Sequence, residues 1–395
     1  MTFPMKSKFE LPEGVIYLNG NSLGPLPAAA QQRAATVISE EWGGELIRAW
    51  NTRGWMALPT VVGDRIAGLI GAQVGTVTTG DTLSIKVFQA LAAALRLNPD
   101  RRVILSDSGN FPTDLYMADG LNKLLGSTYE ITVVEPTEVI ENITDEVAVV
   151  MLTEVDYRTG RLHDMAAITK LAHEKGAVVI WDLAHSAGAI PIDLNACRAE
   201  FAIGCTYKYL NGGPGAPAFI YVRPDLIEHV RPALSGWLGH DAPFAMELGY
   251  RPAMSIERLR VGTPSIVQLS ILDTALDLWD GVDMQDIRRA SIELSEHFIQ
   301  QVEATCPQLR LVSPRDPAKR GSQVSFAFEF AYPAMQALIA RGVIGDFRSP
   351  DIMRFGFTPL FLDRGDVDQA VSHLTEVMTN EEWRDPAYQT KSRVT

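Results

Sequence analysis

Short runs of β-branched and other apolar residues alternate with longer amphipathic segments through the first two thirds of this chain. The runs predict strands at Val103–Ser106, Ile131–Val134, Val147–Leu152, Ala177–Trp181, Phe201–Cys205 and Phe219–Val222, and the longer segments predict helices at Leu83–Leu97, Thr113–Leu125 and Met165–Lys175. This alternation is typical of βαβ units, whose strands pair in parallel. The chain is therefore predicted to be an α/β protein with a mostly parallel sheet covered by helices.

The pattern changes after Gly262, where one long helical stretch is predicted from Ile266 to Ala304. Strand-like and helical pieces follow, including Gln323–Phe330 and Val367–Thr379. A chain of 395 residues exceeds the ~250–300 residues at which a single hydrophobic core stops growing. We therefore expect a large domain and a smaller α+β domain, divided as an N-terminal segment that packs with the small domain (1–50), the large domain (51–255) and the small C-terminal domain (256–395).

The charge balance argues against nucleic acid as a partner. Lys and Arg total 35 against 48 Asp and Glu, which gives a formal net charge of −13, and the basic residues form no run that could follow a phosphate backbone. A small anionic substrate would therefore need a dedicated cation in its binding site.

The cysteines and the apolar stretches indicate the compartment. Cys197, Cys205 and Cys306 are odd in number and widely spaced, which fits neither a disulfide framework nor a zinc site. The N-terminus has no apolar signal region, and apolar stretches such as Val147–Leu152 are far shorter than the ~20 residues that span a bilayer. We expect a cytoplasmic protein that is neither exported nor inserted in a membrane, and no metal site.

Two charged residues follow neighbouring predicted strands. Asp182 ends an apolar strand and Lys208 comes shortly after the next one, and the carboxyl ends of parallel strands are where such sheets bind ligands. Asp182 could instead cap a helix, and Lys208 could serve a phosphate loop, although no GxxxxGK(S/T) spacing exists. A partly desolvated lysine amine suits Schiff-base chemistry.

An aspartate and a lysine at adjacent strand ends indicate pyridoxal 5′-phosphate. The ring nitrogen of this cofactor needs an acidic partner, and its aldehyde carbon needs a lysine amine. No GxGxxG fingerprint is present, so nicotinamide and flavin cofactors, or a simple nucleotide-binding module, have less support.

Five segments, in order along the chain, resemble the kynureninase family: Tyr17–Gly24, Asn110–Asp114, Trp181–His185, Tyr207–Asn211 and Gly236–His240. The resemblance extends from residue 17 to about residue 360 and implies the fold of the fold type I enzymes that use pyridoxal phosphate. The Asp and Lys pair is shared by all fold type I enzymes, whereas the NGNSLG and GWLGH segments are similar to kynureninases in particular.

The resemblance implies roles around the cofactor ring. Lys208 would bind the cofactor covalently and move the substrate α-proton, and Asp182 would pair with the pyridine nitrogen. His185 would lie beside the ring, Phe111 would stack on it, and Asp114 would be a second nearby carboxylate. From the residues alone, His185 and Phe111 could equally be core residues, and Asp114 could cap the helix that starts there.

The phosphate end of the cofactor is assigned in the same way. Leu83 and Ser84, with Thr82, precede or begin a predicted helix whose N–H groups could hold a phosphate. Tyr207 resembles a tyrosine that reaches the phosphate and relays a proton. Trp237 and Thr263 match positions that contact the phosphate from the neighbouring subunit, which implies a homodimer with active sites at the subunit interface.

Substrate-binding residues follow from the resemblance as well. Arg354 would bind the α-carboxylate of a small amino-acid substrate, because its planar guanidinium matches a carboxylate. Trp55, Ser22 and His240 would line the aromatic end of the pocket. The remaining competitors for the carboxylate are Arg341, Arg348 and Arg364.

The implied activity is hydrolysis of L-kynurenine to anthranilate and L-alanine, with 3-hydroxy-L-kynurenine as a second candidate substrate and Lys208, Tyr207 and Asp182 as catalytic residues. Other fold type I enzymes, such as a class V aminotransferase or a cysteine desulfurase, are alternatives. A third alternative is a regulator that binds the cofactor without catalysis.

Overall fold

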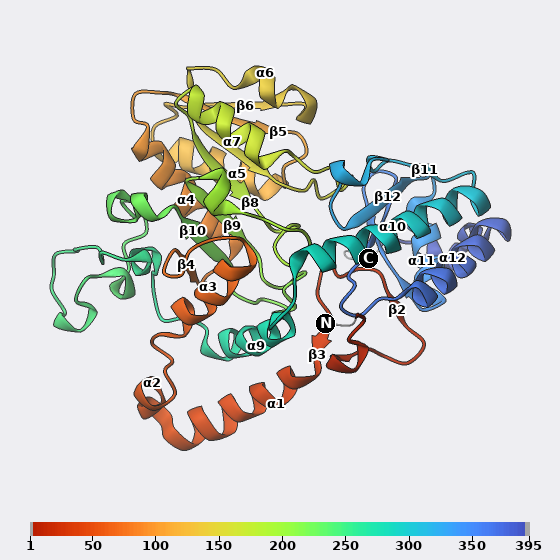
Figure 1. Cartoon of the computed structure of the whole chain (residues 1–395), viewed down its shortest axis with the longest axis horizontal. Helices are drawn as coiled ribbons and strands as arrows, with labels where there is room; N and C mark the ends of the chain where they lie inside the picture. The colour runs from red at the N-terminus through yellow and green to blue at the C-terminus, as the bar shows by residue number, and fades with distance from the viewer. Residues whose placement is uncertain (1–2, 392–395) are drawn as a thin grey trace.

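A seven-stranded sheet forms the core of the larger unit of the computed structural model, which describes residues 3–391 (Figure 1). Its strands, in spatial order, are β4 (Val77–Thr79), β10 (Phe219–Val222), β9 (Phe201–Gly204), β8 (Val178–Asp182), β7 (Val147–Thr153), β5 (Val103–Asp107) and β6 (Glu130–Val134). The five strands from β9 to β6 are parallel, and β10 is antiparallel to both of its neighbours. The predicted mostly parallel sheet is confirmed.

Helices cover both faces of this sheet, as the βαβ pattern predicts. On one face, α4 (Leu83–Leu97) and α5 (Pro112–Leu124) pack on side chains such as Ile180. On the other face, α3 (Leu58–Leu69), α7 (Met165–Glu174) and α9 (Ile266–Leu276) pack on side chains such as Trp181. Neighbouring residues of β8 therefore point into opposite core layers, as the period of two in a strand requires.

A second, antiparallel sheet lies at the other end of the molecule (Figure 1). It consists of β11 (Arg310–Leu311), β12 (Gln323–Ala327), β15 (Ile352–Gly356) and β14 (Asp346–Arg348), with α10 (Met284–Thr305), α11 (Ala331–Ala340) and α12 (Arg364–Thr379) beside it. The N-terminal strand β2 (Ile16–Tyr17) pairs in parallel with β13 (Val343–Ile344). The second unit is α+β as expected, while the exact domain limits stay a prediction.

The prediction of one helix from Ile266 to Ala304 is wrong. Helix α9 ends at Leu276, a short 3₁₀ turn follows at Asp277–Trp279, and α10 begins at Met284. Gly281 has a φ of +72°, a conformation that interrupts a right-handed helix. The carboxylate of Asp283 then accepts the N–H of Gln285 and caps the new helix.

The other predicted helices and strands of the large sheet agree with the structure to within one or two residues. The remaining elements are β1 (Phe9–Glu10), β3 (Leu26–Pro27), α1 (Ala28–Thr36), a π-helical segment (Val37–Glu45), α2 (Ala49–Thr52), α6 (Val139–Asn142) and α8 (Leu194–Cys197), with short 3₁₀ turns between. Within residues 3–391, no helix combines the length and the apolar character needed to cross a membrane.

Candidate active site

The carboxyl ends of β8 and β9 bring Asp182 and Lys208 to one cavity of about 230 Å³. Asp182 is the last residue of β8 and is 2% exposed, and its Oδ1 accepts the N–H of Ala184 at 2.9 Å. That contact closes a turn rather than an α-helix. Lys208 Nζ lies 3.0 Å from His185 Nε2, so three of the predicted cofactor residues meet at this edge of the sheet.

Burial shifts the protonation of the acidic groups in this cavity. It raises the pKa of Asp182 to about 6, an effect that the Lys208 ammonium opposes. Asp114, in the first turn of α5, has a pKa raised well above its usual value by burial and by the negative charge of Asp182. Asp114 Oδ2 finds no hydrogen-bond partner among the described residues, so it does not cap α5.

His185 is neutral in this environment. Burial and then the positive charge of Lys208 lower the pKa of His185 well below its usual value. Its Nδ1 is buried and lacks a hydrogen-bond partner within the described part of the chain. An unpaired ring nitrogen here, together with the unpaired oxygen of Asp114, leaves the cavity wall with unmet polar groups.

Asp182 makes the stability of the cofactor-free protein depend on pH. Its pKa is raised from 3.8 to about 6 by folding, so its contribution to stability is full below about pH 4 and is lost as the pH rises to about 6. We expect Asp182→Asn to be more stable than the wild type above about pH 6, by up to about 3 kcal/mol, and to lose this advantage near pH 4. Thermal melts of cofactor-stripped protein across this range, with the exposed Asp100→Asn as control, measure it; a difference that does not vary with pH contradicts it.

Two aromatic rings border the cavity. Phe111 precedes α5 and is 44% exposed, unlike a core phenylalanine. The ring of Tyr157, which follows β7, meets it edge to face, with 5.1 Å between ring centroids and an angle of 80°. Tyr157 was missed by the sequence analysis, because a tyrosine in a loop carries no periodic signal.

The start of α4 forms another wall. Leu83 and Ser84 line the cavity, and Thr82 is the N-cap residue but makes no side-chain cap bond. The first N–H groups of a helix have no partner within the helix and attract an anion. Tyr207 also lines the cavity, and burial and then the neighbouring Cys205 raise the pKa of its hydroxyl, which keeps it protonated.

A second cavity of about 220 Å³ adjoins the first and shares Phe111, Tyr157, His185, Tyr207 and Lys208 with it. Its far wall holds Asn19, Asn21, Ser22, Asp346, Arg348 and Arg354. Arg354, the cation expected from the acidic charge balance, therefore faces Lys208 across a continuous space.

Arg354 lies on β15 and is 1% exposed. Its Nε donates to Asp346 Oδ1 at 2.8 Å, and its Nη2 donates to Asp346 Oδ2 at 2.5 Å and to Ser22 Oγ at 2.7 Å. Arg348 donates to the same Asp346 Oδ2 at 2.8 Å. Two arginines therefore share one carboxylate, which leaves one net positive charge on this wall of the second cavity.

The other competing arginines lie elsewhere. Arg341 pairs with Glu376 and Glu382, and Arg364 begins α12.

Asp346 was not anticipated from the sequence. It meets Arg354 because antiparallel pairing of β14 and β15 places the two residues directly opposite each other.

Besides Thr82, four predicted residues lie outside both cavities of this single chain. Trp55 donates its ring N–H to Glu41 at 2.9 Å, and the ring of His240 accepts the N–H of Ala242 at 2.9 Å. Trp237 is half-exposed on a short 3₁₀ turn, and Thr263 lines a separate cavity of about 170 Å³. Their roles stay predictions.

Comparisons with known proteins identify the family of the chain. A family model described as the kynureninase C-terminal domain matches residues 287–374, and one described as the DegT/DnrJ/EryC1/StrS aminotransferase family matches residues 65–200. The kynureninase of Pseudomonas fluorescens is 51% identical, and that of Burkholderia pseudomallei is 50% identical; each alignment covers 99% of this chain and 96% of the relative.

Solved structures of similar fold are more distant in sequence. The apo cysteine desulfurase of Thermococcus onnurineus has a TM-score of 0.82 at 17% identity, and covers 96% of this chain and 99% of its own. A C-DES mutant with glycine covalently linked to its PLP cofactor also has a TM-score of 0.82, at 18% identity, over 94% of this chain and 99% of its own. At these identities the likeness shows the fold, which is fold type I.

Proposed function

The chain belongs to the kynureninase family, and we propose that the cavities around Lys208 are where it hydrolyses L-kynurenine to anthranilate and L-alanine with pyridoxal 5′-phosphate. The observation that carries the site assignment is the convergence of three groups on one continuous space. Lys208 and the buried Asp182 stand at adjacent strand ends, and Arg354 stands on the opposite wall.

The residues of the first cavity fit this cofactor. Asp182 is a buried carboxylate whose raised pKa reflects the lack of a full cationic partner, which a protonated pyridine nitrogen would supply. Asp114 and His185 line the same space, and each has a buried polar atom without a partner among the described residues. Phe111 offers an exposed aromatic face, and the start of α4 at Ser84 offers N–H groups for a phosphate.

Each residue has a role in the proposed reaction. The bound cofactor supplies an electron sink that delocalises negative charge from the substrate. Asp182 holds the proton of the pyridine nitrogen, and Lys208 Nζ moves the proton at the substrate α-carbon. Neutral His185, beside Lys208, does not compete for that proton. Tyr207 keeps its hydroxyl proton and would donate it to the β-carbon after water adds to the γ-carbonyl carbon and the Cβ–Cγ bond breaks.

The second cavity would bind the amino-acid part of the substrate. The forked guanidinium of Arg354 is fixed by Asp346 and Ser22, so little side-chain entropy is lost when a carboxylate arrives. Arg348, whose side chain is one-third exposed, adds positive charge at the same wall.

The alternative activities are not favoured. A cysteine desulfurase needs a cysteine that reaches the cofactor, and none of Cys197, Cys205 and Cys306, all within the described residues, lines either cavity. The full-length relatives at about 50% identity are kynureninases rather than aminotransferases or regulators.

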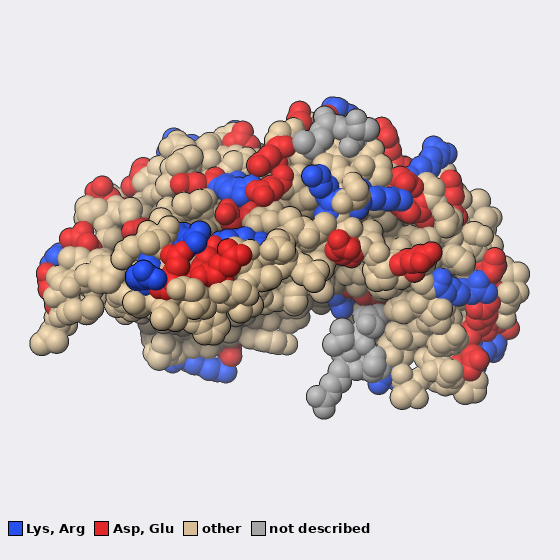
Figure 2. All heavy atoms as spheres, turned by 90° about the horizontal axis from the view of Figure 1, so that it is seen from below, with Lys and Arg blue, Asp and Glu red and all other residues tan. Residues whose placement is uncertain are grey.

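We propose a homodimer whose subunits complete each other's sites. The proposal is supported by the position of Trp237 and Thr263 outside the cavities of their own chain. It is also supported by large apolar side chains exposed on two segments, namely Trp42, Leu46 and Ile47 near α2, and Phe244, Met246, Leu248 and Met254 beyond Trp237. Figure 2, seen from the side of α1 and α2, has wide areas without charged side chains.

A cytoplasmic location is part of the same proposal. All three cysteines are free thiols, and two of them are buried, which suits a reducing compartment.

Product analysis tests the activity. Purified protein loaded with the cofactor and given L-kynurenine should release anthranilate, followed by its fluorescence, and L-alanine in equal amounts. A keto acid without anthranilate would indicate transamination instead. Release of neither anthranilate nor a keto acid would support a regulator that binds the cofactor without catalysis.

A further inference from the structure

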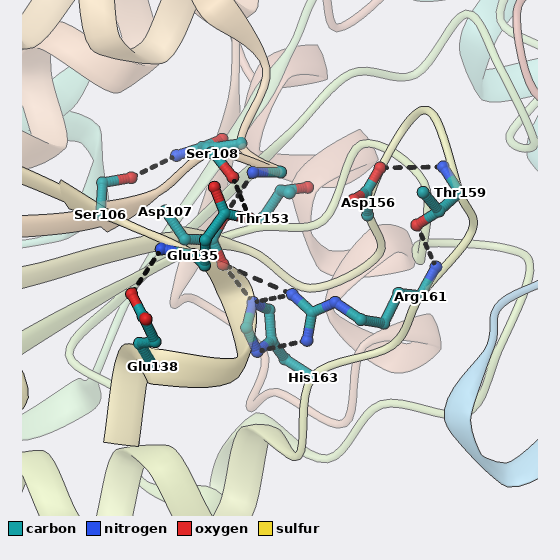
Figure 3. Close-up of polar contacts among 12 residues, drawn as sticks. Ser106, Asp107, Ser108, Glu135, Glu138, Thr153, Asp156, Thr159, Arg161 and His163 are labelled. Atoms are coloured by element: carbon teal, nitrogen blue, oxygen red, sulfur yellow. Dashed lines mark hydrogen bonds and ion pairs between the residues drawn. The ribbon is translucent and has the colours of Figure 1, made fainter. Parts of the chain in front are cut away.

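One buried carboxylate joins two loops that border the first cavity. Asp107, the last residue of β5, is 0% exposed. Its Oδ1 accepts the N–H of Gly109 at 2.9 Å, within the loop 108–111. Its Oδ2, a carboxylate oxygen that can only accept, lies 2.6 Å from His163 Nε2 and 3.5 Å from Arg161 Nη2. The two nitrogens lie 2.9 Å apart, and both residues belong to the loop 155–163 that follows β7 (Figure 3).

The two loops also touch directly at Gly109. A Cβ at this position would lie 2.7 Å from Asp156 Oδ2. The Asp156 carboxylate has little freedom to move away, because its Oδ1 accepts the N–H groups of Arg158 at 2.7 Å and Thr159 at 3.0 Å. Figure 3 shows Asp156 and Thr159 within the same hairpin as Arg161. Only a glycine permits this approach without displacing one loop.

Each loop delivers one aromatic ring to the cavity. Phe111 ends the first loop and Tyr157 belongs to the second, and their rings meet edge to face. The carbonyl oxygen of Tyr157 accepts Arg354 Nη1 at 2.5 Å and Gln323 Nε2 at 3.0 Å. The second loop thus connects the predicted cofactor face with the predicted carboxylate-binding arginine.

We propose that Asp107 and His163 are positioning residues that fix Phe111 and Tyr157 relative to each other and thereby set the cofactor face against Arg354. Neither residue is among those that line the two cavities, so they act through the loops they hold. The inference rests on the proposed function, because it takes these cavities as the reaction site. Displacement of a positioning group by about 1 Å can cost ~10²-fold in rate.

The test compares two replacements of His163 in the holoenzyme. His163→Leu removes the N–H donor, whereas His163→Gln keeps a donor at nearly the same reach. We expect His163→Leu to raise the cofactor dissociation constant at least ~10-fold, to change the circular dichroism of the bound cofactor, and to lower kcat/KM by ~10²-fold. His163→Gln should bring the cofactor dissociation constant, the dichroism and kcat/KM most of the way back to the wild-type values.

Gly109→Ala tests the same link without touching His163, and carries the test if His163→Leu does not fold. It should change the cofactor dichroism and kcat/KM in the same direction. The control is His297→Leu, which breaks a histidine contact of equal length, 2.6 Å to Asp368, near the surface of the small domain. It should leave the cofactor signals and kcat/KM unchanged.

The proposal is overturned if His163→Leu and Gly109→Ala lower only the melting temperature, with cofactor affinity, dichroism and kcat/KM as in the wild type. It is also overturned if His163→Gln is as impaired as His163→Leu. Failure of the proposed function would appear differently, as absence of kynurenine hydrolysis in the wild type.

Discussion

Lys208→Ala is expected to lower the turnover of L-kynurenine by about 10⁴-fold. Lys208 lines both cavities, and it is the one lysine among the described residues that does so. The adjacent His185 cannot replace it as a base for the α-proton, since its low pKa makes it a weak one. Steady-state kinetics with saturating cofactor measure the loss.

A matched control is Lys170→Ala, which removes an exposed lysine that pairs with Glu174 at 3.9 Å. It should retain wild-type turnover. Small primary amines added to Lys208→Ala should restore part of the rate, because they can occupy the vacated space and carry the proton. Turnover of Lys208→Ala within about tenfold of the wild type would show that the proton is moved elsewhere.

Arg354→Ala should raise KM for L-kynurenine by about 10²-fold or more. The substrate carboxylate loses the positive charge of the guanidinium, and the buried Asp346 is left with one cationic partner fewer and repels the substrate. Cofactor affinity should fall much less, because Arg354 lies on the wall of the second cavity only. Kinetics and cofactor titration of the same preparation separate the two effects.

Two further variants identify the cause. Arg348→Ala should raise KM less, because its side chain is one-third exposed and holds Asp346 by one contact. Arg354→Ala combined with Asp346→Asn removes the unpaired carboxylate, and should keep a high KM if Arg354 binds the substrate. A wild-type KM in the double variant would mean that Arg354 serves only to neutralise Asp346.

The strand ends were predictable from the sequence because a parallel sheet gathers them at one edge. Asp182 and Lys208 each follow a short apolar run that is typical of a buried strand, and the parallel pairing of β8 with β9 brings their carboxyl ends together. The covering helix α4 was predicted at its observed limits for a related reason, since its apolar face has a regular period.

The second cavity depends on contacts that local patterns do not encode. Asp346 lines this cavity because of the register between β14 and β15, and Tyr157 because of the course of the loop after β7. The break before α10 depends on a single glycine with a positive φ, Gly281. The resemblance to kynureninases predicted Arg354 but not Asp346, its buried partner. The roles of Trp55 and His240 stay predictions, because both residues lie outside the two cavities of the described chain.

Borohydride reduction of the holoenzyme, followed by peptide mass spectrometry, tests the central assignment most directly. Reduction converts a Schiff base between cofactor and lysine into a stable bond. The account predicts the added cofactor mass on the peptide that contains Lys208 and no addition on Lys86, which is buried but bonded to Gln89 and lines a different cavity. Cofactor fixed on Lys86 or on any lysine other than Lys208 would contradict it.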